Sequence, residues 1–276
     1  KTAAQRIDDL MKIHPKGFDL SLDRITRLLD KLGNPHQRLP PVIHVAGTNG
    51  KGSTIAFCRA ILEAAGLSVH VHTSPHLVNW HERYRMGQKG SPGQLVDDGV
   101  FSEAIERAAL ANAGKPITVF EVLSAVMFVL FSEHAADVCL VEVGLGGRFD
   151  ATNVIDQPAL SIITPVSLDH EAYLGDTFAK IAFEKAGIIK QRVPVICSLQ
   201  DVDALQVIEE KAAKMRAPLQ VAGEHFLAMR ENGRMTWQGD DRLLDLPLPA
   251  LSGDHQVENA ANAIAACFAF AENEGF

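Results

Sequence analysis

The sequence predicts an α/β protein with a mostly parallel sheet flanked by helices in three layers, and a small antiparallel sheet near the C-terminal end. The first observation is a strand–loop–helix–strand order: VIHVAG, a glycine-rich loop, TIAFCRAILEAAG and LSVHVHT. That order is a βαβ unit, which places its strands in parallel with a helix on one face. Strands and periodic helices then keep alternating up to the helix at residues 203–216. Beyond it, Asn232 and Gly233 separate two strand-like runs, which predicts a hairpin within residues 219–246.

The individual elements follow from residue spacing and from end signals. Residues 1–39 are predicted to be mostly helical, and the helix in SLDRITRLLDKLG ends at Gly33. Helical spacing of apolar residues predicts further helices in residues 54–66, 99–113, 120–134, 180–190, 203–216 and 255–275. Short apolar runs predict strands in DVCLVEVG, ALSIITPVS, VPVICS and LQVAG.

Composition narrows the class of protein. The 276 residues are 47% hydrophobic and 22% charged, which is typical of a globular protein with a substantial core. No apolar stretch is long enough to cross a bilayer, and no basic-then-apolar leader begins the chain. The net charge of -8 disfavours a nucleic-acid partner, because phosphate backbones bind basic surfaces. Four scattered cysteines in apolar segments indicate reduced core thiols of a cytoplasmic protein, and they are Cys58, Cys139, Cys197 and Cys267.

The strongest local signal is the loop GTNGKGST at residues 47–54, between a predicted strand and a predicted helix. Glycines let backbone N–H groups curl around phosphate oxygens, and the helix start adds the positive end of its dipole. Lys51 can reach the terminal phosphates of a nucleotide. Ser53 must supply the hydroxyl that holds Mg²⁺, because Gly52 stands where Ser or Thr usually follows the lysine. The loop therefore predicts a P-loop fold, and the alternative is a glycine-rich turn with one exposed lysine.

Two polar residues lie near the ends of predicted strands. Glu142 is the charged residue of an otherwise apolar strand, and His170 follows the strand ALSIITPV. Ligands collect beyond the carboxyl ends of strands in open parallel sheets. We therefore interpret both residues as Mg²⁺ ligands beside the triphosphate, with imidazole an unusual partner for this ion. The alternative is an ion pair between Glu142 and Arg148, with His170 only capping its loop.

Four histidines, His70, His72, His76 and His81, lie in the stretch VHVHTSPHLVNWHER. A zinc site is one interpretation, since His70 and His72 share one face of a strand. The other two follow a proline in a loop, and no cysteine is near. Histidines that face a ligand or a sheet edge are therefore the preferred interpretation.

Five motifs occur in one order: GTNGKGS, TSPHL with Glu82 and Arg83 after it, EVGLGGRFDATN, SLDH with Leu174 and Gly175 after it, and FEKAGIIK. From about residue 20 onward, this series resembles the dihydrofolate synthase/folylpolyglutamate synthase family, which is related to the Mur ligases. The resemblance implies that ATP phosphorylates a carboxylate of dihydropteroate or of a reduced folate, and that the nitrogen of L-glutamate attacks the acyl phosphate. It also implies Mg²⁺ at two sites, and we expect a monomer with neither a nucleic-acid nor a membrane partner.

The resemblance also implies roles for individual residues. Nucleotide binding is assigned to Thr48, Asn49, Gly50, Lys51, Gly52, Ser53 and, near the adenine, Asn259. Metal binding is assigned to Ser53, Ser74, Glu142 and His170. The pterin pocket is assigned to Thr118, Phe120, Asp150 and Ala151. Lys185 matches a lysine that is carbamylated in the family and helps a second Mg²⁺, so the expected catalytic group is Lys51, His170 and Lys185. The alternative for Lys185 is a helix-surface lysine paired with Glu184.

Members of the family continue with a second α/β domain that contributes to the glutamate site. We therefore expect residues 1–276 to be the ATP-binding domain with a helical lead-in, and to be inactive as a ligase alone. A Mur ligase proper would carry a uridine-nucleotide-binding domain before the loop, where about forty residues precede it here. A P-loop switch or kinase would need a tighter Walker pattern. A non-catalytic ATP-binding module is the third alternative.

Overall fold

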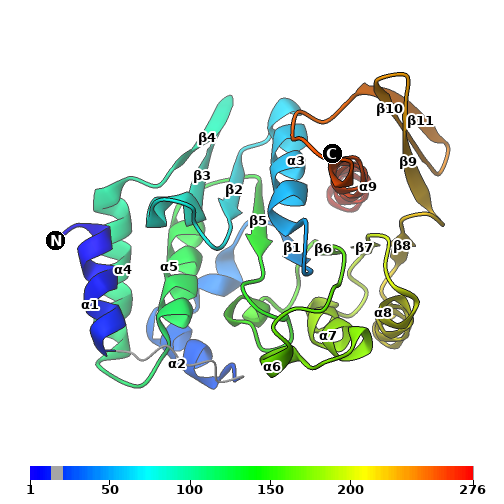
Figure 1. Ribbon diagram of the computed structural model, residues 1–276. Coiled ribbons are helices and arrows are strands. Elements are labelled where there is room, and N and C mark those ends of the chain that lie inside the picture. Colours follow the sequence, from blue (N-terminus) through cyan, green and yellow to red (C-terminus); the bar gives the residue numbers. More distant parts are fainter. Residues whose placement is uncertain (14–20, 276) are drawn as a thin grey trace. The chain divides into compact units, whose positions relative to one another are not determined.

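The computed structural model describes residues 1–13 and 21–275 (Figure 1). Part of the predicted N-terminal helical segment, residues 14–20, lies outside the described residues. The chain forms two compact units, each assembled from segments that are distant in the sequence. The first unit contains Lys1–Val42, Gly66–Leu145 and Phe149–Asp156, and the second contains Ile43–Ala65, Gly146–Arg148 and Gln157–Phe276.

Eight strands form one sheet in the order β4-β3-β2-β5-β1-β6-β7-β8. Their bounds are β1 Val42–Ala46, β2 Val69–His72, β3 Tyr84–Gln88, β4 Ser91–Leu95, β5 Val138–Glu142, β6 Leu160–Ile163, β7 Val195–Cys197 and β8 Leu219–Val221. The pairs β2–β5, β1–β6, β6–β7 and β7–β8 are parallel, whereas β2–β3 and β3–β4 are antiparallel. The predicted mostly parallel sheet is confirmed, and the antiparallel strands β3 and β4 were not predicted.

The core of the first unit is built around helix α5 (Val119–Glu133), which is buried throughout residues 121–131. A helix that is apolar on nearly every side is expected to be enclosed in this way. Three more helices of this unit, α1 (Ala3–Ile13), α2 (Asp23–Lys31) and α4 (Asp98–Asn112), pack against α5 (Figure 1). Short 3₁₀ turns complete it at η1 (Pro35–Arg38), η2 (Trp80–Arg83) and η3 (Ala151–Val154).

In the second unit, helix α9 (His255–Glu274) packs along helix α3 (Lys51–Ala64) (Figure 1). Five of the eleven buried residues of α9 are alanines, whose small side chains let the two helix backbones approach closely. The Cys58 Sγ lies 4.0 Å from the Ala263 carbonyl oxygen, and the Cys267 Sγ lies 3.9 Å from the Cys58 carbonyl oxygen. Helices α7 (Phe178–Lys185) and α8 (Val202–Met215) pack on each other, and α6 (Glu171–Leu174) and η4 (Ala186–Ile188) are short.

A second, three-stranded sheet has the order β11-β10-β9, from strands β9 (Phe226–Glu231), β10 (Arg234–Gly239) and β11 (Arg242–Pro247). Both pairs are antiparallel, and the β9–β10 turn holds Asn232 at φ 50° and Gly233 at φ 74°. Two successive positive φ angles are those of the hairpin turn that Asn-Gly predicts. The predicted small sheet is confirmed, but it begins at Phe226, because β8 joins the large sheet parallel to β7.

The four cysteines are free and buried, as the sequence predicted. Burial in apolar surroundings raises the pKa of the Cys197 thiol to about 12 and raises that of Cys139 further. None of the helices in residues 1–13 and 21–275 combines the length and the apolar character that crossing a bilayer requires.

Candidate active site

The phosphate loop joins the end of β1 to the start of α3 in the second unit, as the sequence predicted. Its glycines are required by the backbone: Gly50 is the left-handed N-cap of α3 at φ 81°, and a side chain at Gly47 would overlap Thr164. The loop is fixed at its first residues, because Thr48 N–H donates to the Pro165 carbonyl at 2.9 Å. Beyond these residues, the first N–H groups of α3 point out of the N-terminal end of the helix, so an anion bound there can accept hydrogen bonds from them.

Two lysines meet at one carbonyl of this loop. The Lys51 Nζ donates to the Gly47 carbonyl oxygen at 3.0 Å and to that of Thr48 at 3.3 Å. The Lys185 Nζ donates to the same Gly47 oxygen at 2.9 Å. Lys185 is the last residue of α7 and only 4% exposed, and Lys51 is half-buried. The loop therefore carries two convergent cations rather than one exposed lysine.

The alternative placement of Lys185 on a helix surface is wrong. Glu184, its expected surface partner, instead forms an ion pair with Arg148 at 2.9 Å. A backbone hydrogen bond joins the same two residues, because the Arg148 N–H donates to the Glu184 carbonyl at 2.8 Å. Gly187 lies so close to Arg148 that a side chain there would overlap its backbone, so this contact holds the end of α7 in place. The result is that Lys185 points to the phosphate loop.

Asn259 also lies against the phosphate loop. It is buried in α9, and a Cβ atom at Gly50 would overlap its Oδ1. Its Nδ2 donates to the Gln256 Oε1 at 3.0 Å, and the Gln256 Nε2 donates to the Ser53 Oγ at 3.3 Å. Gln256 was not among the predicted site residues, because contact between α9 and the loop is a tertiary feature that no local pattern announces.

In the first unit, Glu142 and Ser74 lie together. Glu142 is the last residue of β5 and 5% exposed, and the Ser74 N–H donates to its Oε2 at 2.9 Å. The Glu142 charge also acts on Arg83: burial lowers the pKa of that guanidinium, and the nearby carboxylate opposes the effect. A buried carboxylate at a strand end, beside a serine, is an oxygen-donor pair that suits a hard cation.

His170 lies in a different kind of environment. It follows β6 in the second unit with φ 51°, and its imidazole is half exposed. Its Nε2 lies 3.6 Å from the Asp169 Oδ2, and its carbonyl accepts from the N–H groups of Tyr173 and Leu174 at the start of α6. His170 is therefore at the carboxyl end of a parallel strand, on the same unit as the phosphate loop, as its position after ALSIITPV predicted.

The four residues assigned to the pterin pocket all lie in the first unit, around one loop. Asp150 is buried, and its carboxylate accepts from Gly144 N–H at 3.0 Å, from Leu145 N–H at 2.9 Å and from both Thr152 N–H and Oγ1. Burial raises the pKa of Asp150, and these hydrogen bonds oppose that shift. Because all its partners are local, Asp150 acts on the shape of the loop rather than as an open binding group.

The Phe120 ring covers the other side of this loop. It lies so close to Gly144 that a Cβ atom there would overlap the ring. Phe120 is in the first turn of α5, where Thr118 is the N-cap and shares a capping box with Glu121. Glu121 is in turn paired with Arg24 at 3.1 Å, which fixes the helix start. Ala151, buried in η3, follows Asp150 directly, so the structure brings the four predicted residues to one loop and one helix start.

The histidine-rich stretch forms no shared metal site. His70 uses both ring nitrogens, on the His134 carbonyl and the Gly87 N–H, each at 2.9 Å. The His72 Nδ1 lies 2.9 Å from the Arg83 carbonyl, and burial lowers its pKa to about 4. Separate partners also hold His76 and His81, which lie against Arg83 and Asp98. Within the described residues, no group of three or more His, Cys, Asp or Glu side chains is arranged to hold a metal.

One further local feature was missed by sequence reasoning. The Glu82 carboxylate accepts three backbone hydrogen bonds, from Leu77 N–H at 2.8 Å, Val78 N–H at 2.9 Å and Asn79 N–H at 2.8 Å. Together with the Asn79 cap, this is the reciprocal pattern of a capping box at η2. The spacing of Asn79 and Glu82 is visible in the sequence and would have predicted it. The Glu82 side chain thus binds three successive backbone N–H groups of the loop that follows Ser74.

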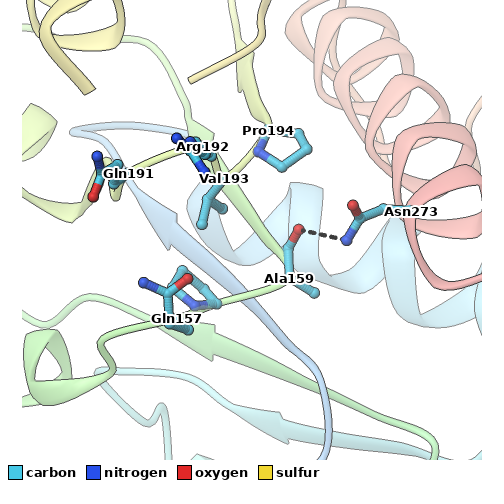
Figure 2. Close-up of a pocket in the computed structure, with 8 residues that line it drawn as sticks. Gln157, Ala159, Gln191, Arg192, Val193, Pro194 and Asn273 are labelled. Carbon is cyan, nitrogen blue, oxygen red and sulfur yellow. Dashed lines mark hydrogen bonds between the residues drawn. The ribbon is translucent and has the colours of Figure 1, made fainter. Parts of the chain in front are cut away.

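A pocket of about 500 Å³ opens elsewhere in the second unit, and Figure 2 shows its lining. Its residues precede β6 and β7, namely Gln157, Pro158, Ala159, Gln191, Arg192, Val193 and Pro194, with Asn273 from the end of α9. Since β1 and β6 are parallel, the starts of β6 and β7 lie at the sheet edge opposite the phosphate loop. None of the predicted site residues lines this pocket.

A glycine-rich loop between a parallel strand and a helix, with two lysines on its carbonyl, defines a P-loop α/β protein. Comparison with known proteins gives the particular group. Residues 45–267 match the Mur ligase middle domain family. The chain therefore belongs to the Mur ligase family.

Its relatives agree with the motif resemblance. A dihydrofolate synthase/folylpolyglutamate synthase of Bacillus subtilis is 35% identical over 263 residues, 91% of this chain and 59% of that protein. Escherichia coli FolC in complex with DHPP and ADP superposes with a TM-score of 0.88, 33% identity, and coverage of 98% of this chain and 62% of that one. A complex of FPGS with AMPPCP and folate gives a TM-score of 0.88, 32% identity, and coverage of 100% and 68%. The resemblance to this family is confirmed, and the chain spans about 59% of the length of the Bacillus relative.

Proposed function

We propose that the chain is the ATP-binding domain of an ATP-dependent ligase that adds L-glutamate to dihydropteroate, to reduced folates, or to both. In this proposal ATP phosphorylates the acceptor carboxylate, and the glutamate nitrogen attacks the acyl phosphate. The observation that carries it is the phosphate loop itself: the Lys51 Nζ lies on the Gly47 carbonyl, where its positive charge can act on a triphosphate, and the buried Lys185 Nζ reaches the same oxygen. The acceptor class is inferred from the relatives, which are a dihydrofolate synthase/folylpolyglutamate synthase and an FPGS that forms a complex with AMPPCP and folate.

The chain's own residues divide the work. The N–H groups of residues 50–53 and the Lys51 ammonium hold the phosphates, and Asn259 fixes the loop from α9. Phe120 and the loop that Asp150 shapes receive the pterin ring, with Thr118 and Ala151 beside them. Lys185 and His170 complete the group that acts on the transferred phosphate. These assignments follow the motif positions, and the contacts above support them.

The described residues fit a magnesium ion that is bound largely by phosphate and water. Mg²⁺ usually takes one or two carboxylates and keeps several waters, so it needs no all-protein cage. The first unit offers the buried Glu142 carboxylate beside Ser74, and the second unit offers the Ser53 hydroxyl, with His170 as a further candidate. When bound, Mg²⁺ would neutralise charge on the phosphate oxygens. A second ion would require the carbamate that the family match assigns to Lys185.

Calorimetric titration of the 276-residue chain tests this function. We expect Mg-AMPPCP and dihydropteroate to bind, and a UDP-linked muropeptide to give no heat. Binding of the muropeptide without dihydropteroate would instead assign a Mur-type acceptor. If Mg-AMPPCP binds but neither dihydropteroate nor the muropeptide does, the chain is an ATP-binding module without an acceptor site. If Mg-AMPPCP does not bind, the proposal is overturned. Labelled glutamate incorporation by the full-length protein then tests the ligation step.

A further inference from the structure

Gln256 connects two residues of the nucleotide site. It is the second residue of α9 and 8% exposed. Its Nε2 donates to the Ser53 Oγ at 3.3 Å, and its Oε1 accepts from the Asn259 Nδ2 at 3.0 Å. The Nε2 also lies 3.2 Å from the His255 Nε2, so both amide hydrogens have a partner. A carboxamide with every arm engaged is held in one orientation.

That orientation fixes the role of the Ser53 hydroxyl. Because Asn259 donates to Gln256 Oε1, the Gln256 amino group must face Ser53, and it donates to the serine oxygen rather than accepting from it. A serine oxygen has two lone pairs and one hydrogen. The Gln256 donor occupies one lone pair, which leaves the second for a cation and the hydrogen for a phosphate oxygen. The Gln256 amide thus orients the Ser53 hydroxyl so that its oxygen can bind a cation and its hydrogen can bind a phosphate oxygen.

The same residues close around the start of α3. Asn259 approaches Gly50 so closely that a side chain there would overlap its Oδ1, and Ser53 is in the first turn of the helix that Gly50 caps. Gln256 therefore joins both ends of this short segment through α9. A contact of this kind holds the loop in the binding geometry before the nucleotide arrives, which reduces the entropy lost on binding.

We infer that Gln256 is a positioning residue that orients the Ser53 hydroxyl for a magnesium–nucleoside triphosphate. This inference rests on the proposed function, because it assigns the ligand of the phosphate loop. It predicts that Gln256 contributes to the metal-dependent part of nucleotide affinity and does not touch the nucleotide itself.

The test is Gln256→Met, which keeps the length of the side chain and removes its hydrogen bonds to Ser53, Asn259 and His255. AMPPCP affinity is measured by calorimetry with excess Mg²⁺ and again with EDTA, for wild type and variant. With Mg²⁺ we expect about a 3- to 10-fold weaker affinity, the size of one lost neutral hydrogen bond. With EDTA we expect a smaller change, because no metal then needs the serine oxygen. Gln206→Met is the matched control, since Gln206 is exposed on α8 and its amide contacts Glu210.

A double-mutant cycle with Ser53→Ala gives the second readout. If Gln256 acts through Ser53, the Gln256→Met change should cost almost nothing once the hydroxyl is absent. Equal loss with Mg²⁺ and with EDTA, or full additivity in the cycle, would overturn the inference. Should Gln256→Met fail to fold, Gln256→Glu keeps the acceptor for Asn259 and removes the donor to Ser53, and the same comparison applies. If the wild type fails to bind Mg-AMPPCP, the proposed function is overturned. If the wild type binds normally and the Gln256 variant is unaffected, only the inference about Gln256 is overturned.

Discussion

Lys51 reaches the phosphate loop carbonyls from the first position of α3, where its ammonium can follow charge that develops on a transferred phosphate. We expect Lys51→Ala to lower the turnover of the full-length enzyme by roughly 10²–10³, the typical loss of one such electrostatic contact. Steady-state assays with dihydropteroate, ATP and labelled glutamate measure it. Lys214→Ala on α8 is the control. A Lys51→Ala enzyme with wild-type turnover would exclude Lys51 from the site.

Glu142 is a second residue whose charge, rather than its shape, matters. Glu142→Gln keeps the side-chain volume and one oxygen for Ser74 N–H, but it loses the charge that attracts a hard cation. We expect the Mg²⁺ concentration for half-maximal activity to rise in the full-length variant. An unchanged Mg²⁺ titration, accompanied by a lower melting temperature, would instead assign Glu142 a purely structural role.

Lys185 is expected to carry a carbamate, as the family match at FEKAG implies. Its buried Nζ donates to the same Gly47 carbonyl oxygen as the Lys51 Nζ, so the amine lies at the phosphate loop, where the family role of the carbamate requires it. Carbon-13 NMR of the full-length enzyme with labelled bicarbonate should show one carbamate signal that Lys185→Arg removes. An active enzyme without that signal at high bicarbonate would contradict this expectation.

At the scale of elements, the Glu82 carboxylate binds three backbone N–H groups of the loop of residues 74–82. Three backbone N–H donors, first that of Leu77, lower the pKa of Glu82 below its ordinary 4.5. A lowered folded-state pKa stabilises the loop above pH 4.5, and that stabilisation is lost as the pH falls through the lowered value. We therefore expect the loop to loosen at acid pH before the fold does.

The chain's two tryptophans allow this to be measured. Trp80 lies within this loop, at the start of η2, whereas Trp237 is buried in β10 and its Nε1 donates to the Ala261 carbonyl. With 5-fluorotryptophan, the ¹⁹F signal of Trp80 should shift below pH 4.5 while that of Trp237 stays in place. Glu82→Gln should show the shifted Trp80 signal already at pH 7. Simultaneous movement of both signals would mean global unfolding instead.

The sequence predicted the elements whose pattern is strong and local. The apolar helix α5, the alanine-rich α9 and the Asn-Gly hairpin were all found from spacing and turn chemistry. Strands β3 and β4 were not, because residues 84–95 are polar, contain three glycines and lie at a sheet edge where alternation is weak. The start of the small antiparallel sheet was misplaced, because the short run LQV has the same strand pattern in either sheet.

The candidate site divides in the same way. Loop residues such as Lys51 and Ser53 are contiguous in a motif, so their chemistry could be predicted before their geometry. The contacts that orient them come from elsewhere: Gln256 arrives from α9 and Lys185 from α7, at sequence separations of 203 and 138 residues. Burial of Lys185, which decides between a surface lysine and a site residue, is a property of packing and has no local signature.

At the scale of the whole molecule, the four buried thiols report on folding. A hydrogen bond with Cys267 and burial raise the pKa of Cys58, and burial is the main cause of the raised pKa of Cys139 and Cys197, so little reactive thiolate forms in the native state. We expect Ellman's reagent to react with no thiol in native buffer and with all four in guanidinium. Rapid reaction of any thiol in the native protein would place that cysteine outside the core.

The shared Gly47 oxygen has a consequence for regulation. Two ammonium donors now compete for one acceptor, and a carbamate on Lys185 would remove one donor and reverse its charge. The free energy of nucleotide binding would then depend on how much carbon dioxide the lysine has taken up. Linkage is reciprocal, so the nucleotide must alter the carbon dioxide affinity of Lys185 by the same factor. Dissolved inorganic carbon would thus act as a thermodynamic effector of this loop, and its concentration would set the apparent affinity for ATP.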